Sequence, residues 1–433
     1  MPPPPPPRPS DASVLLFVDP DAAPETRWTD AVRRAAAACV AEAREGPRAR
    51  PPGAEPRLLV FFCASNSESA SESASAASAS RRARLLEACY DAIADVAPTL
   101  DLIPLLPSLG WDAASVALEL VPRDAEWRCA AVGEGRADAA AAAAVSARAS
   151  DPRGGFRPLV PIDARDAETT KTTKTTKTAE ARGRTPDATW SAALRAPPGQ
   201  RRVSVGGTFD RMHAGHRLLL AAAALATWGS AAEGGEAGRF EEGGDRAAED
   251  RAEDRGEDPS GAEDREEDVG RRRASSSEDD ASDATLKRPG PTLFVGVTGP
   301  ALLGKKARAE LLEPYEVRAS RAEAFARACV RFRASEEPLD VRVGPLDASP
   351  PLAATTRAMT ALATSRETAA GGAAINDARR EAGFEALALL EVGLVGGGGG
   401  EEGGKLSSSA LRDEEARRRT DGDGDADEGN IKG

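Results

Sequence analysis

Short hydrophobic runs alternate with longer amphipathic stretches in the first part of the chain. Residues Ser13–Val18 and Arg57–Cys63 are rich in branched and aromatic side chains, which predicts buried β-strands. Apolar residues at helical spacing predict helices over Trp28–Ala43 and Arg82–Val96. Because strands and helices alternate, we expect residues 11–165 to form a small α/β domain. It contains no glycine-rich loop or acid–base cluster, so its role is not evident from the sequence.

The second half of the chain repeats this alternation. Strands are predicted at 201–205, 293–297, 339–343 and 386–392. One helix is predicted over Gly215–Ala226, and another starts at Pro314, because proline suits the first helical turn. The apolar side chains of the second helix lie near one face: Val317, Phe325, Cys329 and Phe332. This order favours a parallel sheet covered on both faces, a Rossmann-like α/β domain over residues 199–415.

Polar and low-complexity stretches mark the boundaries of these two domains. We expect a proline-rich tail at 1–10, a linker at 166–198, a disordered acidic insert at 229–288 and a disordered tail at 416–433. Most of the formal charge of −13 comes from residues 231–283, which hold 20 acidic and 8 basic residues. The rest of the chain is nearly neutral, so a nucleic-acid-binding surface is not expected.

Composition also excludes other classes of protein. No run of about 18 apolar residues occurs, and the start lacks the pattern of a signal peptide, so no membrane partner is expected. The five cysteines are scattered and form no Cys-x-x-Cys pair, which argues against structural zinc and favours a reducing compartment. We therefore expect a cytoplasmic protein.

The only two histidines of the chain, His213 and His216, lie in one short segment that reads GGTFDRMHAGH from Gly206. This segment follows a predicted strand and opens a predicted helix. A glycine turn before a helix N-terminus favours phosphate, because free backbone N–H groups and the helix dipole both attract anions. Imidazoles at such a site can donate hydrogen bonds to phosphate oxygens.

Other interpretations of this segment are weaker. The two histidines could bind a metal ion with Asp210, or be purely structural, but no cysteine or third histidine is available as a ligand. The glycine spacing does not match the dinucleotide pattern Gly-x-Gly-x-x-Gly. The stretch from Gly299 to Lys305 matches most of a P-loop, but Lys306 stands where that loop needs Ser or Thr.

The His-x-Gly-His segment resembles the first signature of the nucleotidyltransferase superfamily. Later segments are similar to eukaryotic-type phosphopantetheine adenylyltransferases, in matching order over about Val203–Arg412: LFVGVTGPALLGKK from Leu293, EPYEVR from Glu313, SRET from Ser365, Gly371-Gly372 with Asn376, Arg379 and Gly383, and KLSSSALR from Lys405. Class I aminoacyl-tRNA synthetases share related motifs, but the catalytic region here is too small and no basic tRNA-binding surface is evident.

The resemblance implies the transfer of the adenylyl group of ATP, with Mg²⁺, to 4′-phosphopantetheine, giving dephospho-coenzyme A and pyrophosphate. It implies three groups of residues. The catalytic residues would be Thr208, His213, His216 and Lys305. ATP would be bound by Gly207, Thr208, Phe209, His216, Ser407, Ser408 and Ser409. The acceptor would be bound by Thr208, Lys305 and Arg366.

The chain departs from the family at several positions. Thr298-Gly299-Pro300 lacks the acid of the family's Thr-Asp-Gly-Pro, and Arg366 replaces a lysine. Asp347-Ala348-Ser349-Pro350-Pro351 replaces an Asp-Pro-aromatic-Gly segment. Two alternatives therefore stay open: a nucleotidyltransferase for another small molecule, or a nucleotide-binding regulatory protein that has lost activity.

Overall fold

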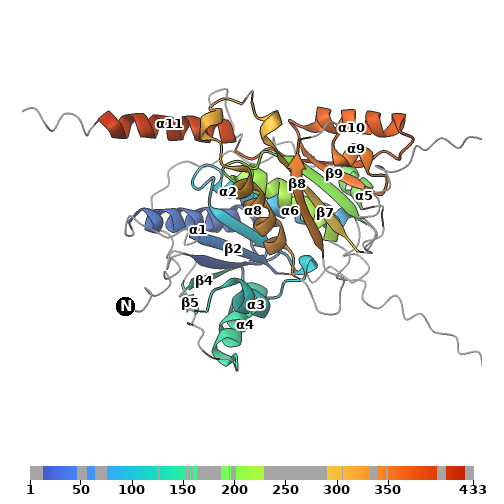
Figure 1. Cartoon of the computed structure of the whole chain (residues 1–433). Coiled ribbons are helices and arrows are strands. Elements are labelled where there is room, and N and C mark those ends of the chain that lie inside the picture. Colours follow the sequence, from blue (N-terminus) through green and yellow to red (C-terminus); the bar gives the residue numbers. More distant parts are fainter. Residues whose placement is uncertain are drawn as a thin grey trace, which may run out of the picture.

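A computed structural model describes the chain over residues 13–45, 56–63, 76–123, 127–152, 154, 157, 159–162, 187–194, 196, 201–228, 290–304, 306–331, 339–347, 350–396 and 406–424. The expected proline-rich tail, the acidic insert and most of the linker lie outside these residues. The described residues form two α/β domains (Figure 1).

The first domain has a five-stranded parallel sheet in the order β3-β2-β1-β4-β5. Its elements are β1 (Val14–Val18), α1 (Glu25–Glu45), β2 (Arg57–Phe62), α2 (Ala76–Ile93), β3 (Asp101–Leu105), α3 (Ala113–Ser115), β4 (Trp127–Val132), α4 (Arg136–Ser150) and β5 (Leu159–Pro161). Both predicted strands and both predicted helices are confirmed, although α2 starts at Ala76 and not at the expected Arg82.

The second domain also has a five-stranded parallel sheet, in the order β10-β9-β6-β7-β8. Its elements are β6 (Arg202–Gly207), α6 (Ala214–Trp228), β7 (Thr292–Thr298), α8 (Tyr315–Cys329), β8 (Asp340–Leu346), α9 (Leu352–Thr355), β9 (Ala361–Ser365), α10 (Ala369–Glu381), β10 (Ala388–Val392) and α11 (Ser408–Gly424). The α/β class and the parallel sheet are as predicted. Both domains have a Rossmann-like arrangement.

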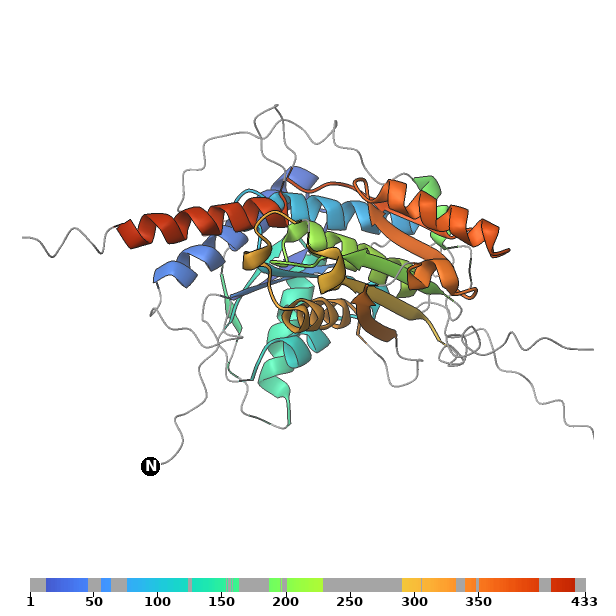
Figure 2. The ribbon, with the colours of Figure 1, turned by 45° about the horizontal axis from the view of Figure 1, so that its top comes forward.

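Three local expectations differ from the structure. Part of the expected linker is helix α5 (Asp187–Ala193), because Trp190 is only 1% exposed and anchors this helix against β10 and α2. Helix α11 continues to Gly424, beyond the predicted domain end at 415, and projects past the second sheet (Figures 1 and 2). Val317 is 37% exposed rather than core-facing, whereas Phe325 and Cys329 of the same helix are buried.

The two domains share more than their strand order. In each, a buried arginine late in the helix between the fourth and fifth strands donates hydrogen bonds to backbone carbonyls. Arg148 donates to the carbonyls of Ala117, Val121, Pro122 and Arg157. Arg379 donates to those of Ala353, Thr356, Arg357 and Glu385. Each arginine thus ties its helix to the segment before the fourth strand and to the segment before the fifth.

One continuous hydrophobic core joins the domains. Helix α2 of the first domain packs beside α6 of the second (Figures 1 and 2). Every α6 residue from Arg217 to Trp228 is buried, which is unusual because a helix on a sheet normally keeps one face in water. The helix that carries His216 is therefore enclosed by both domains.

Candidate functional site

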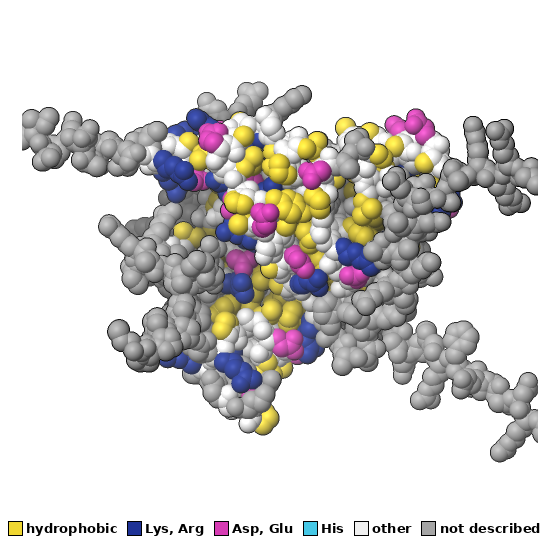
Figure 3. All heavy atoms as spheres, in the orientation of Figure 1, with side chains coloured by type: hydrophobic (Ala, Val, Ile, Leu, Met, Phe, Trp, Pro, Cys, Tyr) yellow, Lys and Arg dark blue, Asp and Glu magenta, His cyan; other side chains and the backbone are white. Residues whose placement is uncertain are grey.

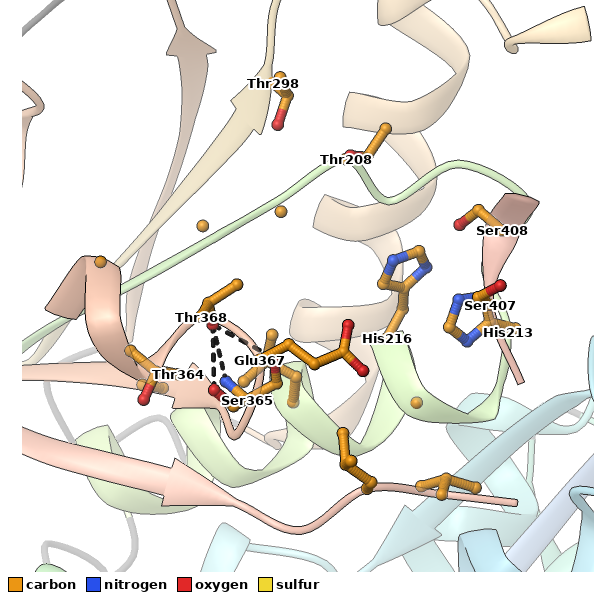
Figure 4. Close-up of a pocket in the computed structure, with 18 of the residues that line it drawn as sticks. Thr208, His213, His216, Thr298, Thr364, Ser365, Glu367, Thr368, Ser407 and Ser408 are labelled. Carbon is orange, nitrogen blue, oxygen red and sulfur yellow. Dashed lines mark hydrogen bonds between the residues drawn. The ribbon is translucent and has the colours of Figure 1, made fainter. Parts of the chain in front are cut away.

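A cavity of about 640 Å³ opens at the carboxyl ends of β6, β7 and β9. The strand order reverses between β6 and β9, and ligands of open α/β sheets bind at such a reversal. The volume falls within the range of about 300–1,000 Å³ typical of small-molecule sites. Its polar lining residues include Thr208, His213, His216, Lys306, Glu367, Ser407, Ser408, Ser409 and Arg412 (Figure 4).

The turn after β6 brings the backbone close to this cavity. Gly207 lines it, and a Cβ at that position would lie 3.1 Å from the Phe209 ring. Phe209 itself is fully buried, has a φ of 49°, and does not line the cavity. The sequence led us to expect that Phe209 contacts ATP, but its buried side chain does not reach the cavity. Its ring packs against Gly207 of the glycine turn. The centroid of this ring lies 5.4 Å from the centroid of the His216 ring.

Asp210 holds the turn after β6 in place through several hydrogen bonds. This fully buried carboxylate accepts hydrogen bonds from the backbone N–H of Glu313 at 3.0 Å and from the Arg412 guanidinium at 2.5 Å. Its backbone carbonyl accepts the Ser408 hydroxyl at 2.9 Å. Asp210 therefore connects the first motif to two segments that lie about a hundred and two hundred residues later.

Arg318 holds the ends of two strands together. Its side chain is 1% exposed and donates to the carbonyls of Thr208 at 2.6 Å and Thr298 at 2.9 Å. It also donates to the Glu313 carbonyl at 3.0 Å. The Glu-Pro-Tyr-Glu-Val-Arg segment thus shapes the cavity from outside, a role that its sequence alone does not reveal.

The two imidazoles stack face to face at the start of α6, with ring centroids 3.9 Å apart. Burial, helped by the positive charge of Arg217, lowers the pKa of His213 to about 4. Burial, His213 and the charges of Arg217 and Lys306 hold the pKa of His216 well below 6.5. Both rings are therefore neutral near pH 7, and each can donate one N–H.

The serine motif lies beside the two histidines in the cavity lining (Figure 4). The Ser407 hydroxyl accepts the N–H of Ala410 at 3.2 Å, which makes Ser407 the cap of α11. The backbone N–H groups of Ser408 and Ser409 belong to the first helical turn, where no intrahelical acceptor exists. Two helix N-termini, those of α6 and α11, consequently meet at one cavity.

The lysine that lines the cavity is Lys306. Lys305, the residue expected from the sequence, lies outside the described residues. Arg366, expected to bind the acceptor, does not line the cavity and instead lies 3.6 Å from Glu391 across the β9–β10 edge. Its neighbour Glu367 extends into the cavity toward His216 (Figure 4).

Apolar side chains also form part of the cavity lining. They include Leu346, Leu362, Ile375, Leu394 and Val395, and the polar Ser365 and Thr368 lie at the β9–α10 turn. These two hydroxyls lie 3.2 Å apart and bond to each other and to the turn backbone, which fixes the turn (Figure 4). The lining thus combines N–H donors and one lysine with apolar side chains and the Glu367 carboxylate.

The turn after β7 lies against an acidic side chain from another strand. A Cβ at residue 299 would lie 1.5 Å from the carboxylate oxygen Oδ1 of Asp347, which follows β8. A larger residue at 299 would have to displace this side chain. An acidic group therefore borders the turn, supplied by another strand.

The described residues lack some features that would mark a metal site or a membrane span. They contain no group of three or more His, Cys, Asp or Glu side chains that could hold a metal ion. No helix among them is long and apolar enough to cross a membrane. Basic and acidic side chains are mixed on the described part of the face in Figure 3, rather than gathered into a basic patch.

Comparison of the chain with protein-family models, with curated proteins and with solved structures found no match.

Proposed function

We propose that the protein transfers the adenylyl group of ATP to a small phosphate-bearing acceptor, and that this acceptor is 4′-phosphopantetheine. The observation that carries the proposal is the meeting of two helix N-termini, two neutral imidazoles and Lys306 around one cavity. Such a set of fixed donors suits a polyphosphate, because it supplies N–H groups and positive charge in one place.

The proposed chemistry needs no general base. An oxygen of the acceptor phosphate, already anionic, forms a bond to the α-phosphorus of ATP. The bond from that phosphorus to the bridging oxygen breaks, and its electron pair leaves with pyrophosphate. Negative charge moves onto the oxygens around the α-phosphorus and onto the leaving group. Catalysis is then positioning and charge stabilisation.

Each donor has a distinct part in this proposal. His216 and Thr208 stabilise the reacting phosphate beside the β6 turn, while the first turn of α11 at Ser408 and Ser409 holds the leaving pyrophosphate. Lys306 supplies positive charge. Mg²⁺ would accompany ATP and would offset part of the negative charge of its phosphates.

The apolar side chains of the lining support the choice of acceptor. Leu362, Ile375 and Leu394 can pack against an uncharged chain, and Glu367 can accept hydrogen bonds from its amide or hydroxyl groups. Phosphopantetheine has such a chain beyond its phosphate. A second anionic group of an acceptor near Glu367 would be repelled by this carboxylate.

The test compares pyrophosphate release from MgATP with phosphopantetheine, nicotinamide mononucleotide, flavin mononucleotide and glycerol 3-phosphate. Phosphopantetheine should give the highest kcat/KM. Lys306→Ala should raise KM and lower kcat, whereas Arg380→Ala, a change on the exposed surface of α10, should leave both unchanged.

Two other results would separate the alternatives. Faster turnover with another acceptor would replace phosphopantetheine as the substrate but keep the reaction. ATP binding without pyrophosphate release for any acceptor would favour the nucleotide-binding regulatory protein.

A further inference from the structure

The start of α6 is held by the first domain. The N–H of Ala214, the first residue of the helix, donates to the carbonyl of Pro98 at 2.7 Å. One turn further on, the Arg217 guanidinium donates to Oδ1 of Asp101 at 2.7 Å. Pro98 and Asp101 flank the start of β3, so two contacts from one short segment hold the first turn of α6.

Asp101 is itself oriented within the first domain. Its second carboxylate oxygen accepts the Arg57 Nε at 2.7 Å, which leaves Oδ1 directed at the second domain. Arg217 is 9% exposed at its side chain and lies over the Phe325 ring of α8, 5.3 Å from its centroid. A guanidinium this buried has no water to replace a lost partner, so its position depends on the Asp101 carboxylate.

Arg217 is also the residue of α6 that links this pair to the histidines. Its backbone N–H donates to the carbonyl of His213 at 3.1 Å. Its positive charge contributes to lowering the pKa of both His213 and His216. A shift of Arg217 therefore reaches both rings, through the backbone and through the electric field.

We propose that Asp101 of the first domain is a positioning residue for the candidate site in the second domain, acting through Arg217 on the rotation and place of the first turn of α6. This inference rests on the proposed function and deepens it. It gives the first domain a task in adenylyl transfer, although that domain contributes no side chain to the described lining of the cavity.

The matched comparison is between two carboxylates at the same domain interface. Asp101→Asn removes the charge that holds Arg217 but keeps the size of the side chain. Glu119→Gln is the control, because Glu119 pairs with Arg331 across the interface at 2.8 Å and does not contact α6. Both changes remove one ion pair between the domains, and only the first touches the helix that carries the histidines.

Asp101→Asn should lower kcat by about 10- to 100-fold with little change in KM for ATP, since a misplacement of about 1 Å can cost a hundredfold in rate. Glu119→Gln should keep kcat within about twofold. Asp101→Glu, which restores the charge, should recover most of the loss. In NMR spectra of the full chain, Asp101→Asn should shift the imidazole signals of the only two histidines more than Glu119→Gln does.

A purely structural role for Asp101 would lower the melting temperature of Asp101→Asn, with unchanged kcat and with histidine signals shifted no more than in Glu119→Gln, and would overturn the proposal. A wild-type chain that releases no pyrophosphate would refute the proposed function instead. The NMR comparison would then still decide whether Asp101 positions the histidines. Equal signal shifts in both variants would mean that it does not.

Discussion

The imidazoles of His213 and His216 are neutral groups at the point where the proposed reaction develops negative charge. A neutral ring costs less to bury than a charged one, which explains how two histidines can share one wall of the cavity. The Nδ1 atoms of both rings are buried without a hydrogen-bond partner among the described residues. The described residues thus leave one buried polar atom unsatisfied on each ring.

His216→Asn should lower kcat strongly, because the proposed hydrogen bond from this ring strengthens only in the transition state. Removal of one such donor typically costs about 10²–10³ in rate. Affinity for ATP, measured by calorimetry, should change much less. Near-normal kcat in steady-state kinetics would show that His216 is structural.

Stability should depend on pH through the same two rings. The pKa of His213 is about 4 in the folded chain and 6.5 as the ordinary value, so the unfolded chain binds the proton more readily between these values. The contribution of neutral His213 to the free energy of unfolding is complete above about pH 6.5 and is lost as the pH falls toward 4. The lowered pKa of His216 makes stability depend on pH in the same direction.

Urea unfolding at pH 7 and pH 5 measures this dependence. His213→Gln should lose less stability than the wild-type chain between the two pH values, because glutamine does not titrate. An equal loss in both proteins would mean that His213 is protonated as easily in the folded chain as in the unfolded one.

The His-x-Gly-His segment and the serine motif were recognisable in the sequence, but the direction of each side chain near them was not. The spacing of Gly207, His213 and His216 after a strand is a local pattern, and the cavity contains all three. Which of two adjacent lysines faces the cavity depends on how the loop after β7 folds. The same holds for Arg366 and Glu367 at the β9–α10 turn. Glu367 lines the cavity and Arg366 does not, because the turn and not the residue type sets the direction of each side chain.

At the scale of elements, α11 is attached to the β6 turn by three contacts, of which one is a fully buried arginine. Arg412 is 1% exposed and donates to Asp210, to the carbonyl of Ala307 and to the Ser409 hydroxyl at 3.1 Å. One planar guanidinium thus joins three segments, a geometry that lysine cannot reproduce. The Ser408 hydroxyl and the Glu415 carboxylate, which pairs with Arg211, add to this attachment.

Arg412→Met should destabilise the protein by about 3–5 kcal/mol, because it leaves the buried Asp210 carboxylate without its closest cation. It should also reduce activity in the fraction that stays folded, since α11 loses part of its attachment. Arg418→Ala removes an exposed pair with Glu414 on the same helix and should change stability by less than about 1 kcal/mol. Equal unfolding midpoints for the two variants would contradict the proposed attachment.

Strands with continuous branched side chains were predictable, as at Val14–Val18 and Thr292–Thr298. Strands β3 and β4 were not, because β3 contains a proline and β4 mixes alanine with arginine. Helix α5 is only seven residues long and depends on burial of Trp190, a tertiary contact that no local pattern encodes. Its position within a polar stretch made it look like part of a linker.

At the scale of the whole molecule, the two domains are not independent. The sequence predicted residues 199–415 as a separate domain, but α6 is buried on all sides from Arg217 to Trp228. A chain that begins at Leu194 would expose the face of α6 that α2 covers. Large exposed apolar patches favour aggregation over a folded monomer.

We expect the chain that begins at Leu194 to be aggregated or loosely packed in size-exclusion chromatography and near-ultraviolet circular dichroism. Co-expression of residues 1–193 as a separate chain should restore a soluble complex, because it supplies the missing α2 face. A monodisperse, well-packed monomer of the shortened chain would show that α6 does not need the first domain.

The burial of α6 between both domains has a consequence for how the protein is made. Domains fold as units during synthesis, starting from the N-terminus. The residues of β1 to β5 leave the ribosome before Ala214 does, so the surface that receives α6 can already be complete when this helix emerges. The first domain can then serve as the template on which the second sheet assembles, which would shorten the time that a strongly apolar helix is exposed to water and to other nascent chains.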